Sequence, residues 1–380
     1  MAFINSNDTS KRYTTKYGEP YLYFSGDVTT LPSNKQTVTA SDGASSDRFG
    51  QYVNISSGKI LVSAPLDDDT ASASGSAYIY DLDGSGEIKI NASDPSSNVY
   101  FGQKSDIGQG RIVVGSWGNH TASTNAGAAY IFDLKGTQLT KLTATDASSN
   151  DSFGYGCAVG SGRIVVGAYN DNRTTPYTHN GSIYLYDLSG TYLRKIIAPN
   201  ETPTPTSFGG VISIGCGRIV VGALSTNSSR GVVFIYDVDG NLIKKIDTPS
   251  SINSNNAKFG ESISVSQGRI VVGSMSNKIF IYDLDGNLLK EITNTDESNF
   301  GFGSSQETFE QTVAVGSGRI VTKASTYIIV FDLDGNYIGK VDVGDNFYFI
   351  SIRCGKIACS NWSSGNGLVY TFDTPRVYTP

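Results

Sequence analysis

Alternating apolar and polar residues, broken by glycine-rich turns, run through most of this chain. Residues 151–170, "DSFGYGCAVGSGRIVVGAYN", hold one alternating run, a tight Gly-Arg turn and one continuous apolar run. Alternation with period two predicts a half-buried strand, and a short apolar run between turns predicts a buried one. Together with the tail of the same unit, the pattern predicts four strands, which we name A to D, near residues 155–161, 163–168, 182–188 and 192–198.

The same unit occurs seven times along the chain. A Gly-Arg-Ile or Gly-Lys-Ile triplet separates strands A and B, and an Asp-Gly turn, as in "DVDGNL", usually joins strands C and D. The aromatic residues that open the units are Phe49, Phe101, Phe153, Phe208, Phe259, Phe309 and Phe347. Four antiparallel strands in each repeat of this length are typical of a propeller blade. We therefore predict an all-β fold, a seven-bladed β-propeller of four-stranded antiparallel blades over residues 35–380.

The two ends of the repeat array complement one another. The seventh unit ends at "YTFDTPRVYTP" without an Asp-Gly turn or a strand D, whereas "KQTVTASDGASSDRFG" before the first Phe-Gly matches the end of an interior unit. Residues 36–41 are therefore predicted to supply the missing outer strand of the last blade. Such pairing closes the ring and leaves no gap between the first and last blades.

A basic residue begins strand B in every unit, and an aspartate ends strand C. Because these strands are antiparallel neighbours, the two charges are expected to face each other across the ladder, where opposite charges stabilise the sheet. The ring of cations is thus interpreted as structural rather than as a polyanion site. The predicted pairs are Lys59–Asp81, Arg111–Asp133, Arg163–Asp187, Arg218–Asp237, Arg269–Asp283, Arg319–Asp332 and Lys356–Asp373.

Composition excludes some partners. The chain has 43 glycines and 22 tyrosines but only 17% charged residues, and its net charge is −6 without a basic run, so no nucleic-acid partner is expected. Its N-terminal sequence lacks the apolar core of a secretory signal, and no apolar run approaches the ~18 residues of a membrane span. A soluble protein folded in a cytoplasm, without membrane insertion, is expected.

Cys157, Cys216, Cys354 and Cys359 lack metal-ligand spacing and are predicted to be buried free thiols.

The order Phe-Gly, Gly-Arg-Ile-Val-Val-Gly-Ala, variable loop, Gly, Ala-Tyr-Ile-Tyr-Asp resembles the FG-GAP repeat, the unit of the integrin α-subunit propeller. The second half is clearest at "LVSAPLDDDTASASGSAYIYD", and the resemblance covers about residues 36–373. Many members of that family carry a calcium loop of the form Asp-x-Asp-x-Asp-Gly between strands A and B. Here only a tight turn such as "GSGR" stands there, so no calcium site is carried over. Asp237-Val238-Asp239-Gly240 is interpreted as a hairpin turn.

Variable sequence is concentrated in the connections from strand B to strand C, which are long in the first three units and very short in the fifth and sixth. Loops on a rigid scaffold carry specificity, and Trp, Tyr and Arg are frequent anchors of binding surfaces. The candidate ligand- or partner-binding residues on this loop face are Trp117, His120, Tyr169, Arg173, Tyr177, His179 and Trp362. The alternative is that Trp117 fills a gap over strand B and that the loops are only solvated.

Catalytic and metal sites are not expected. The two histidines have no Ser/His/Asp, HExxH or phosphate-loop context, so no catalytic residue and no cofactor is assigned. Asp67, Asp68 and Asp69 could hold a cation, but three consecutive carboxylates without a shaping glycine are more often a solvated turn. No metal ligand is assigned.

Residues 1–34 are too irregular for a blade and are predicted to form an aromatic-rich arm that packs on the propeller or docks into a partner. Its candidate docking residues are Tyr13, Tyr17, Tyr21 and Tyr23.

We predict a non-enzymatic binding or structural module. An adhesin-like, Asn/Ser/Thr-rich chain without an export signal favours a tailed-phage virion protein, with other virion proteins bound by the arm and a host glycan or protein bound by the loops. The alternatives are a propeller glycosidase or lyase acting on polysaccharide and a bacterial scaffold or adhesion protein.

Overall fold

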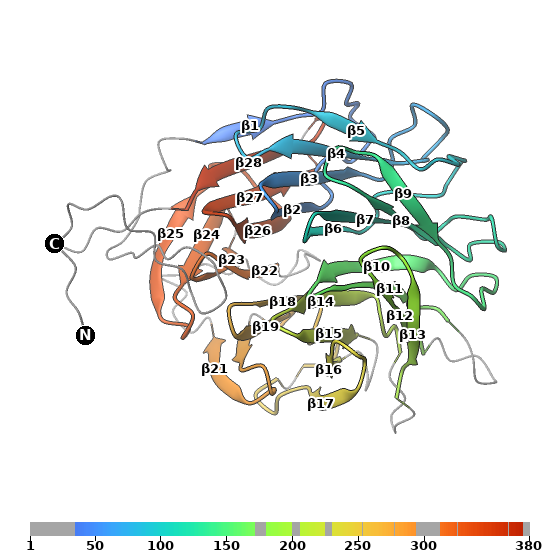
Figure 1. Ribbon diagram of the computed structural model, residues 1–380. Helices are drawn as coiled ribbons and strands as arrows, with labels where there is room; N and C mark the ends of the chain where they lie inside the picture. The colour runs from blue at the N-terminus through green and yellow to red at the C-terminus, as the bar shows by residue number, and fades with distance from the viewer. Residues whose placement is uncertain are drawn as a thin grey trace.

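The computed structural model describes residues 35–171, 180–199, 206–224, 230–252, 254–276, 278–293, 312–324, 326–363 and 365–374. Within these ranges every regular element is a strand, and the strands form seven four-stranded antiparallel sheets around a central axis (Figure 1). The predicted all-β, seven-bladed propeller is confirmed. Across the same ranges no helix is long and apolar enough to cross a bilayer.

Each of the first six blades runs from its inner to its outer strand in chain order. The first three blades contain β2 (Val53–Ser56), β3 (Lys59–Ala64), β4 (Ser76–Asp81) and β5 (Ile88–Ile90); β6 (Ser105–Gly108), β7 (Arg111–Ser116), β8 (Ala128–Phe132) and β9 (Gln138–Leu142); and β10 (Phe153–Gly160), β11 (Arg163–Ala168), β12 (Ser182–Asp187) and β13 (Tyr192–Ile197). β10 and β11, which lie in residues 151–170, form where the alternation and the apolar run predict them.

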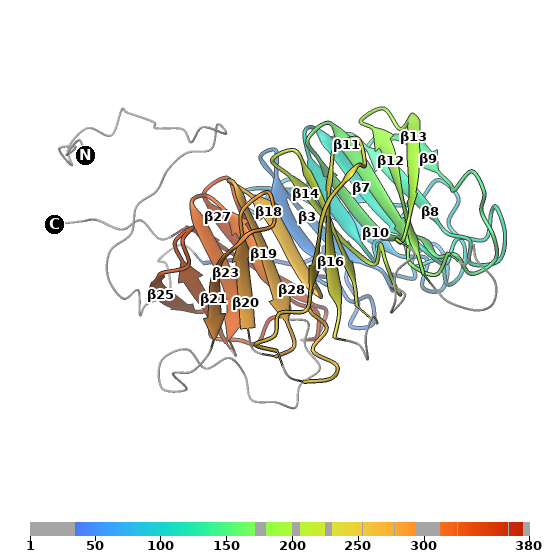
Figure 2. The same cartoon turned by 90° about the horizontal axis from the view of Figure 1, so that it is seen from below.

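The next three blades follow the same plan. They contain β14 (Val211–Gly215), β15 (Arg218–Ala223), β16 (Val232–Asp237) and β17 (Leu242–Asp247); β18 (Ser262–Ser266), β19 (Arg269–Ser274), β20 (Lys278–Tyr282) and β21 (Leu288–Thr293); and β22 (Val313–Gly316), β23 (Arg319–Ala324), β24 (Tyr327–Phe331) and β25 (Tyr337–Asp342). Figure 2 shows the ring from the side, with short hairpin turns along its upper edge.

The seventh blade combines the two ends of the repeat array. It contains β26 (Phe349–Arg353), β27 (Lys356–Asn361), β28 (Leu368–Asp373) and the N-terminal strand β1 (Gln36–Val38). β1 pairs antiparallel with β28, with Val38 opposite Val369, and the Val38 side chain is buried. The predicted closure is confirmed, although the paired strand is shorter than residues 36–41. The predicted arm, residues 1–34, lies outside the described residues.

The hydrophobic core lies between the blades, in seven clusters that each join two adjacent sheets. The opening phenylalanines are central to it: Phe101 is fully buried and meets Tyr130 and Phe132 edge-on, at centroid distances of 5.5 and 5.9 Å. Edge-to-face rings are a favoured aromatic geometry. The predicted packing of this aromatic between blades is confirmed for the described openers, and Phe309 lies outside the described residues.

The glycine before strand C is required by the contact with the next blade. A Cβ added at Gly75 would lie 2.1 Å from the carbonyl oxygen of Phe101, and the φ of Gly75 is +80°. Only glycine combines this backbone conformation with so close an approach. The repeat therefore keeps a glycine here to bring the B–C loop of one blade against the opener of the next.

The A–B turns form a hydrogen-bonded ring near the axis. Ser57 and Gly58 both have positive φ values, 53° and 76°, as a two-residue type I′ turn requires. In six turns the side chain of the first residue accepts the glycine N–H of the following blade's turn. These acceptor–donor pairs are Ser57–Gly110, Gln109–Gly162, Ser161–Gly217, Cys216–Gly268, Gln267–Gly318 and Ser317–Gly355, at 2.7–3.5 Å.

Two of the predicted charge pairs within the blades form, and in both the cation is lysine. Lys59 meets Asp81 and Lys356 meets Asp373, each at 2.6 Å. Four arginines instead reach the C–D turn of the next blade, so their predicted pairing is wrong. Arg163 donates from Nε to the Val238 carbonyl and from Nη2 to Asp239 at 2.9 Å. Arg218 and Arg269 bind Asp285 and Asp334 in the same way, and Arg111 binds the Leu188 carbonyl.

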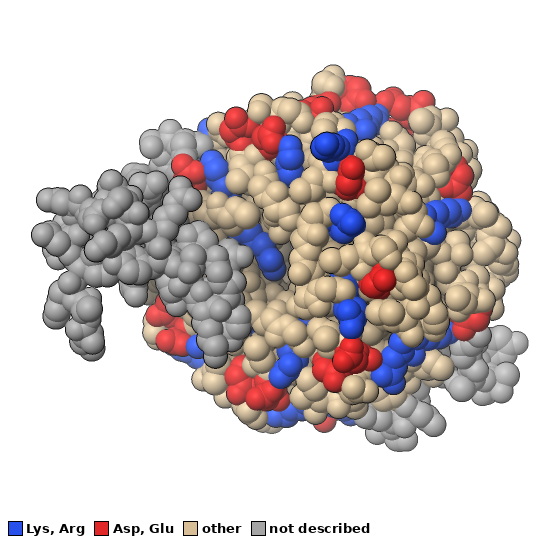
Figure 3. Space-filling model, viewed as in Figure 1, with Lys and Arg blue, Asp and Glu red and all other residues tan. Residues whose placement is uncertain are grey.

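Turn chemistry explains this exchange of partners. Asp237, opposite Arg218 in the ladder, uses its Oδ1 to accept the N–H groups of Asp239 and Asn241 in its own turn. An Asp that closes its own turn in this way offers less to a cation across the ladder. The longer, forked guanidinium then joins neighbouring blades. Lys and Arg side chains are accordingly interspersed with Asp and Glu around the central hollow in Figure 3.

Candidate binding surface

A lysine surrounded by oxygen atoms lies beneath the long B–C loop of the first blade. Nζ of Lys89, on β5, is 2.7 Å from Asp42, 2.8 Å from Asp67 and 2.6 Å from Asp69. The hydroxyl of Tyr78, on β4, donates to Asp42 and Asp67. Asp67 and Asp69, two of the three carboxylates considered above as a cation site, thus bind the protein's own ammonium group, which neutralises them.

The second and third blades repeat this arrangement. In the second, Lys141 binds Asp94 at 2.7 Å, and Tyr130 also donates to Asp94. Burial raises the pKa of Asp94, but hydrogen bonds from Lys141, Tyr130 and Asn119 outweigh it and lower that pKa to about 2. In the third blade, the lysine, tyrosine and two carboxylates are Lys195, Tyr184, Asp146 and Asp171.

We call each of these a lysine–carboxylate cluster. One carboxylate precedes the blade, the tyrosine lies on strand C, the lysine lies on strand D, and an Asp or Asn comes from the B–C loop, so each cluster ties four segments together. At the tyrosine position the next three blades have Phe234, Phe280 and Ile329, none of which carries a hydroxyl. Among the first six blades the clusters therefore accompany the long loops, and in the seventh Tyr370 also donates to an aspartate, Asp345.

The clusters were missed in the sequence although a signal exists. An aspartate stands seven residues before Phe49, Phe101 and Phe153, at Asp42, Asp94 and Asp146. Its repetition in the long-loop units alone distinguishes it from a solvated acidic residue. The lysine and tyrosine partners are directly opposite in the β4–β5 ladder, as at Tyr78 and Lys89.

Three of the predicted anchors form aromatic pairs at the base of these loops. Trp117 is half-buried and stacks on Tyr100 at a centroid distance of 4.9 Å with an interplanar angle of 7°. Tyr169 contacts Tyr155 at 4.1 Å. The third pair, on the seventh blade, is Trp362 with Tyr348 at 4.9 Å, and Arg48 lies over the Trp362 ring at 5.0 Å. Each anchor thus packs on an aromatic of its own blade.

Of the remaining predicted residues, His120 lies within the described part of the chain. His120 is exposed, and its Nδ1 accepts the N–H of Asn125 at 3.1 Å, which shapes the loop of the second blade. The other candidates lie outside the described residues: Arg173, Tyr177 and His179 on the third loop, and Tyr13, Tyr17, Tyr21 and Tyr23 on the arm. In the described ranges no group of three or more His, Cys, Asp or Glu residues could hold a metal ion.

The cysteines differ in their exposure. Cys157 and Cys359 are buried, and burial raises the pKa of both thiols. Cys216 is half-buried and Cys354 is exposed, both at the first position of an A–B turn. All four are free, but the predicted burial is wrong for Cys354, and Cys216 is buried only in part.

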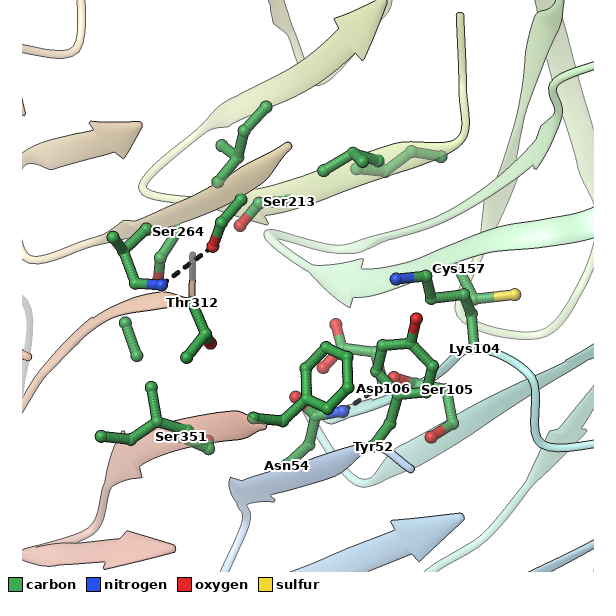
Figure 4. Close-up of a pocket in the computed structure, with 18 of the residues that line it drawn as sticks. Tyr52, Asn54, Lys104, Ser105, Asp106, Cys157, Ser213, Ser264, Thr312 and Ser351 are labelled. Atoms are coloured by element: carbon green, nitrogen blue, oxygen red, sulfur yellow. Dashed lines mark hydrogen bonds between the residues drawn. The ribbon is translucent and has the colours of Figure 1, made fainter. Parts of the chain in front are cut away.

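Strand A of each blade lines a cavity of about 200 Å³ on the propeller axis. Figure 4 shows Asn54, Lys104 and Asp106 on one side of it and Ser213, Ser264 and Thr312 on the other. Innermost strands have an unpaired edge, which side chains here satisfy across blades. Ser213 accepts the N–H of Val265 at 3.1 Å, and Ser264 and Ser351 do the same for Val315 and Ile55.

In the second blade, Asp106 occupies the strand-A position at which three other blades have Ser213, Ser264 and Ser351. Its Oδ2 accepts the N–H of Val159 in the next blade at 2.8 Å, and its Oδ1 accepts the N–H of Ile107. Desolvation raises the pKa of this carboxyl to about 6, against the lowering effect of the two N–H groups and of Arg353. Asp106 is thus a blade-to-blade acceptor that ionises at a cost to the folded state.

Asp106→Ser should remove this cost while keeping the bond to Val159. Because the folded-state pKa is raised, the ionised carboxylate destabilises the fold, and the penalty develops as pH rises from about 4 to about 6. The variant should gain roughly 2 kcal/mol in unfolding free energy over the wild type at pH 7 and nothing near pH 4. Denaturant unfolding at both pH values measures this, and equal gains at both would contradict it.

With the fold and the loop face described, comparison with known proteins identifies the repeat. Residues 32–80, 85–132 and 137–186 match the FG-GAP repeat. These segments run from the closing strand β1 through strand C of the third blade, so the residues similar to the FG-GAP repeat lie in the part of the propeller that carries the lysine–carboxylate clusters. No curated protein sequence matches the chain.

Solved structures share the propeller at low sequence identity. The computationally designed protein Ika8 is 14% identical, with a TM-score of 0.52 over 88% of this chain and 98% of Ika8. A chain in a crystal structure of the mitotic checkpoint complex is 11% identical, with a TM-score of 0.58 over 94% of this chain and 99% of that one. At such identities the likeness shows the fold alone. A β-propeller whose first three blades match the FG-GAP repeat suggests a binding or structural module.

Proposed function

We propose that this protein is a non-enzymatic binding module whose ligand contacts the B–C loop face of the first three blades. The observation that carries the proposal is the lysine–carboxylate cluster under each of these loops. Lys89 binds Asp67 in the first B–C loop, Lys141 binds Asn119 and Thr121 in the second, and Lys195 binds Asp171 at the start of the third. Ordering a loop before the ligand arrives lowers the entropy cost of binding.

The aromatic pairs supply contact area beside the fixed loops. Trp117 and Tyr169 stand at the same position after strand B in adjacent blades, each half-buried against a second aromatic ring. Rigid aromatic side chains make large contacts at low conformational cost and frequently anchor binding surfaces. Sugar rings and protein side chains are both suited to such a surface, so a host surface glycan or protein is the proposed ligand class.

We propose further that the module is displayed on the virion of a tailed bacteriophage, with the arm of residues 1–34 binding other virion proteins. The support is the Asn/Ser/Thr/Gly-rich composition of an adhesin-like propeller and the separation of the aromatic-rich arm from the blades in sequence. Neighbouring genes test this location. Capsid, portal and tail genes beside the coding sequence would support it, and a metabolic operon would contradict it.

The binding proposal is tested with two alanine variants and a matched control. Trp117→Ala and Tyr169→Ala should each weaken binding to bacterial cells or to a glycan array by about tenfold, because each removes an anchor ring. Met275→Ala changes the equivalent position of the short-loop fifth blade and should leave binding unchanged. Thermal unfolding of each variant separates lost contacts from lost folding. Unchanged binding by both stably folded variants would contradict the site.

A further inference from the structure

One residue breaks the repeat at the axial end of the A–B turns. The last residue of strand A is glycine in four blades and serine in two, namely Gly108, Gly160, Gly215, Gly316, Ser56 and Ser266. In the seventh blade it is Arg353. Small residues leave space at the axis, where five of these six line one cavity together with Arg353.

This space is a cavity of about 390 Å³, and Arg353 is the one charged residue among those that line it. The arginine is half-buried, and its Cγ would lie 3.3 Å from a Cβ added at Gly316, so its stem lies against this glycine of the sixth blade. Over the described ranges no salt bridge or hydrogen bond is formed by its guanidinium. Its electrostatic partner is Asp106, whose oxygens accept two backbone N–H groups.

A second donor in the same cavity also lacks a partner. Gln267, only 6% exposed, lines the cavity and accepts the N–H of Gly318 through Oε1 at 2.7 Å. A backbone N–H requires an acceptor, so this bond fixes which branch of the amide is oxygen. Nε2 is consequently a buried donor, and within the described part of the chain it has no hydrogen-bond partner. Leaving such a donor unsatisfied destabilises a fold.

We propose that this axial cavity binds a small oxyanion, a carboxylate or a phosphate-like group, between Arg353 and Gln267. A guanidinium presents two parallel N–H donors that match either anion, and charge-assisted hydrogen bonds of this kind are strong. The hydroxyls of Ser56, Ser161 and Ser266 add donors at the wall, and no carboxylate lines the cavity to compete. The site lies at the A–B turns, so it does not depend on the function proposed for the B–C loop face.

The repeat itself supplies variants that should fold. Arg353→Ser installs the residue that two other blades have at this position. Gln267→Ser installs the residue of three other turns, in which the serine hydroxyl accepts the glycine N–H, as Ser161 does for Gly217. The amide donor is lost and the blade-to-blade bond is kept. Lys135→Ser removes one charge from an exposed C–D turn and is the charge-matched control.

Calorimetric titration with inorganic phosphate, sulfate and succinate, at constant ionic strength set by sodium chloride, tests the site. We expect saturable binding of at least one anion by the wild type, a loss of about tenfold or more in affinity for Arg353→Ser, a smaller loss for Gln267→Ser, and no change for Lys135→Ser. The anion that binds most tightly distinguishes a tetrahedral from a carboxylate ligand. No saturable binding by the wild type, or equal binding by Arg353→Ser, would overturn the proposal.

Discussion

A chain that starts at residue 42 should lose on the order of 5 kcal/mol of unfolding free energy, because it lacks the outer strand of its last blade. β1 contributes the buried side chain of Val38, its ladder with β28 and the Lys35 ammonium, which lies 3.8 Å from the centre of the Tyr370 ring and donates to the Val343 carbonyl. One buried valine and a few ladder bonds sum to about this value. Denaturant unfolding monitored by circular dichroism measures it.

Two substitutions separate closure from any effect of shortening the chain. Val38→Asp places a carboxylate in the cluster that joins the seventh and first blades and should approach the loss seen on truncation. Thr37→Asp alters the exposed neighbour of Val38 and should cost less than about 1 kcal/mol. If the truncated chain unfolds at the same denaturant concentration as the full chain, the ring does not depend on this strand.

Asp67→Ala should be the most damaging single change on the loop face, at about 2 kcal/mol. The Asp67 side chain is 2% exposed, and its removal takes a carboxylate from Lys89 and an acceptor from Tyr78. Breaking a buried pair leaves a charge without its partner. The loss of unfolding free energy stays moderate because Lys89 is 21% exposed and keeps its ion pair with Asp42. Limited proteolysis should also cut more readily within residues 68–73, since the loop loses its attachment.

Asp69→Ala is the matched control for that change. It removes another carboxylate within 2.6 Å of the same Nζ, but the Asp69 side chain is 54% exposed, so the loss should stay below about 0.5 kcal/mol. Equal losses for the two variants would show that burial does not decide the strength of the cluster. Unfolding and proteolysis of both, under identical conditions, complete the comparison.

The candidate surface could be predicted only in outline. Trp117 and Tyr169 were found because large aromatics stand out in polar loops, and both lie at the base of the long loops. The function of Asp67 could not be found from its neighbours Asp68 and Asp69, because its lysine comes from β5, more than 20 residues further along the chain. Arg353 was likewise unremarkable in sequence, because its position matters only once five small residues from other blades are brought around the same axial cavity.

The sequence by itself determined the repeat, the four strands of each blade, the seven-fold ring and its closure by the N-terminal strand. These features follow from period-two alternation and from turns such as Asp-Gly, which act over a few residues. Only the tertiary structure decided which aspartate each arginine meets, which lysine neutralises the acidic loop and where the axial cavity lies. Such contacts join neighbouring blades or distant strands, so their partners depend on how the sheets pack and not on local pattern.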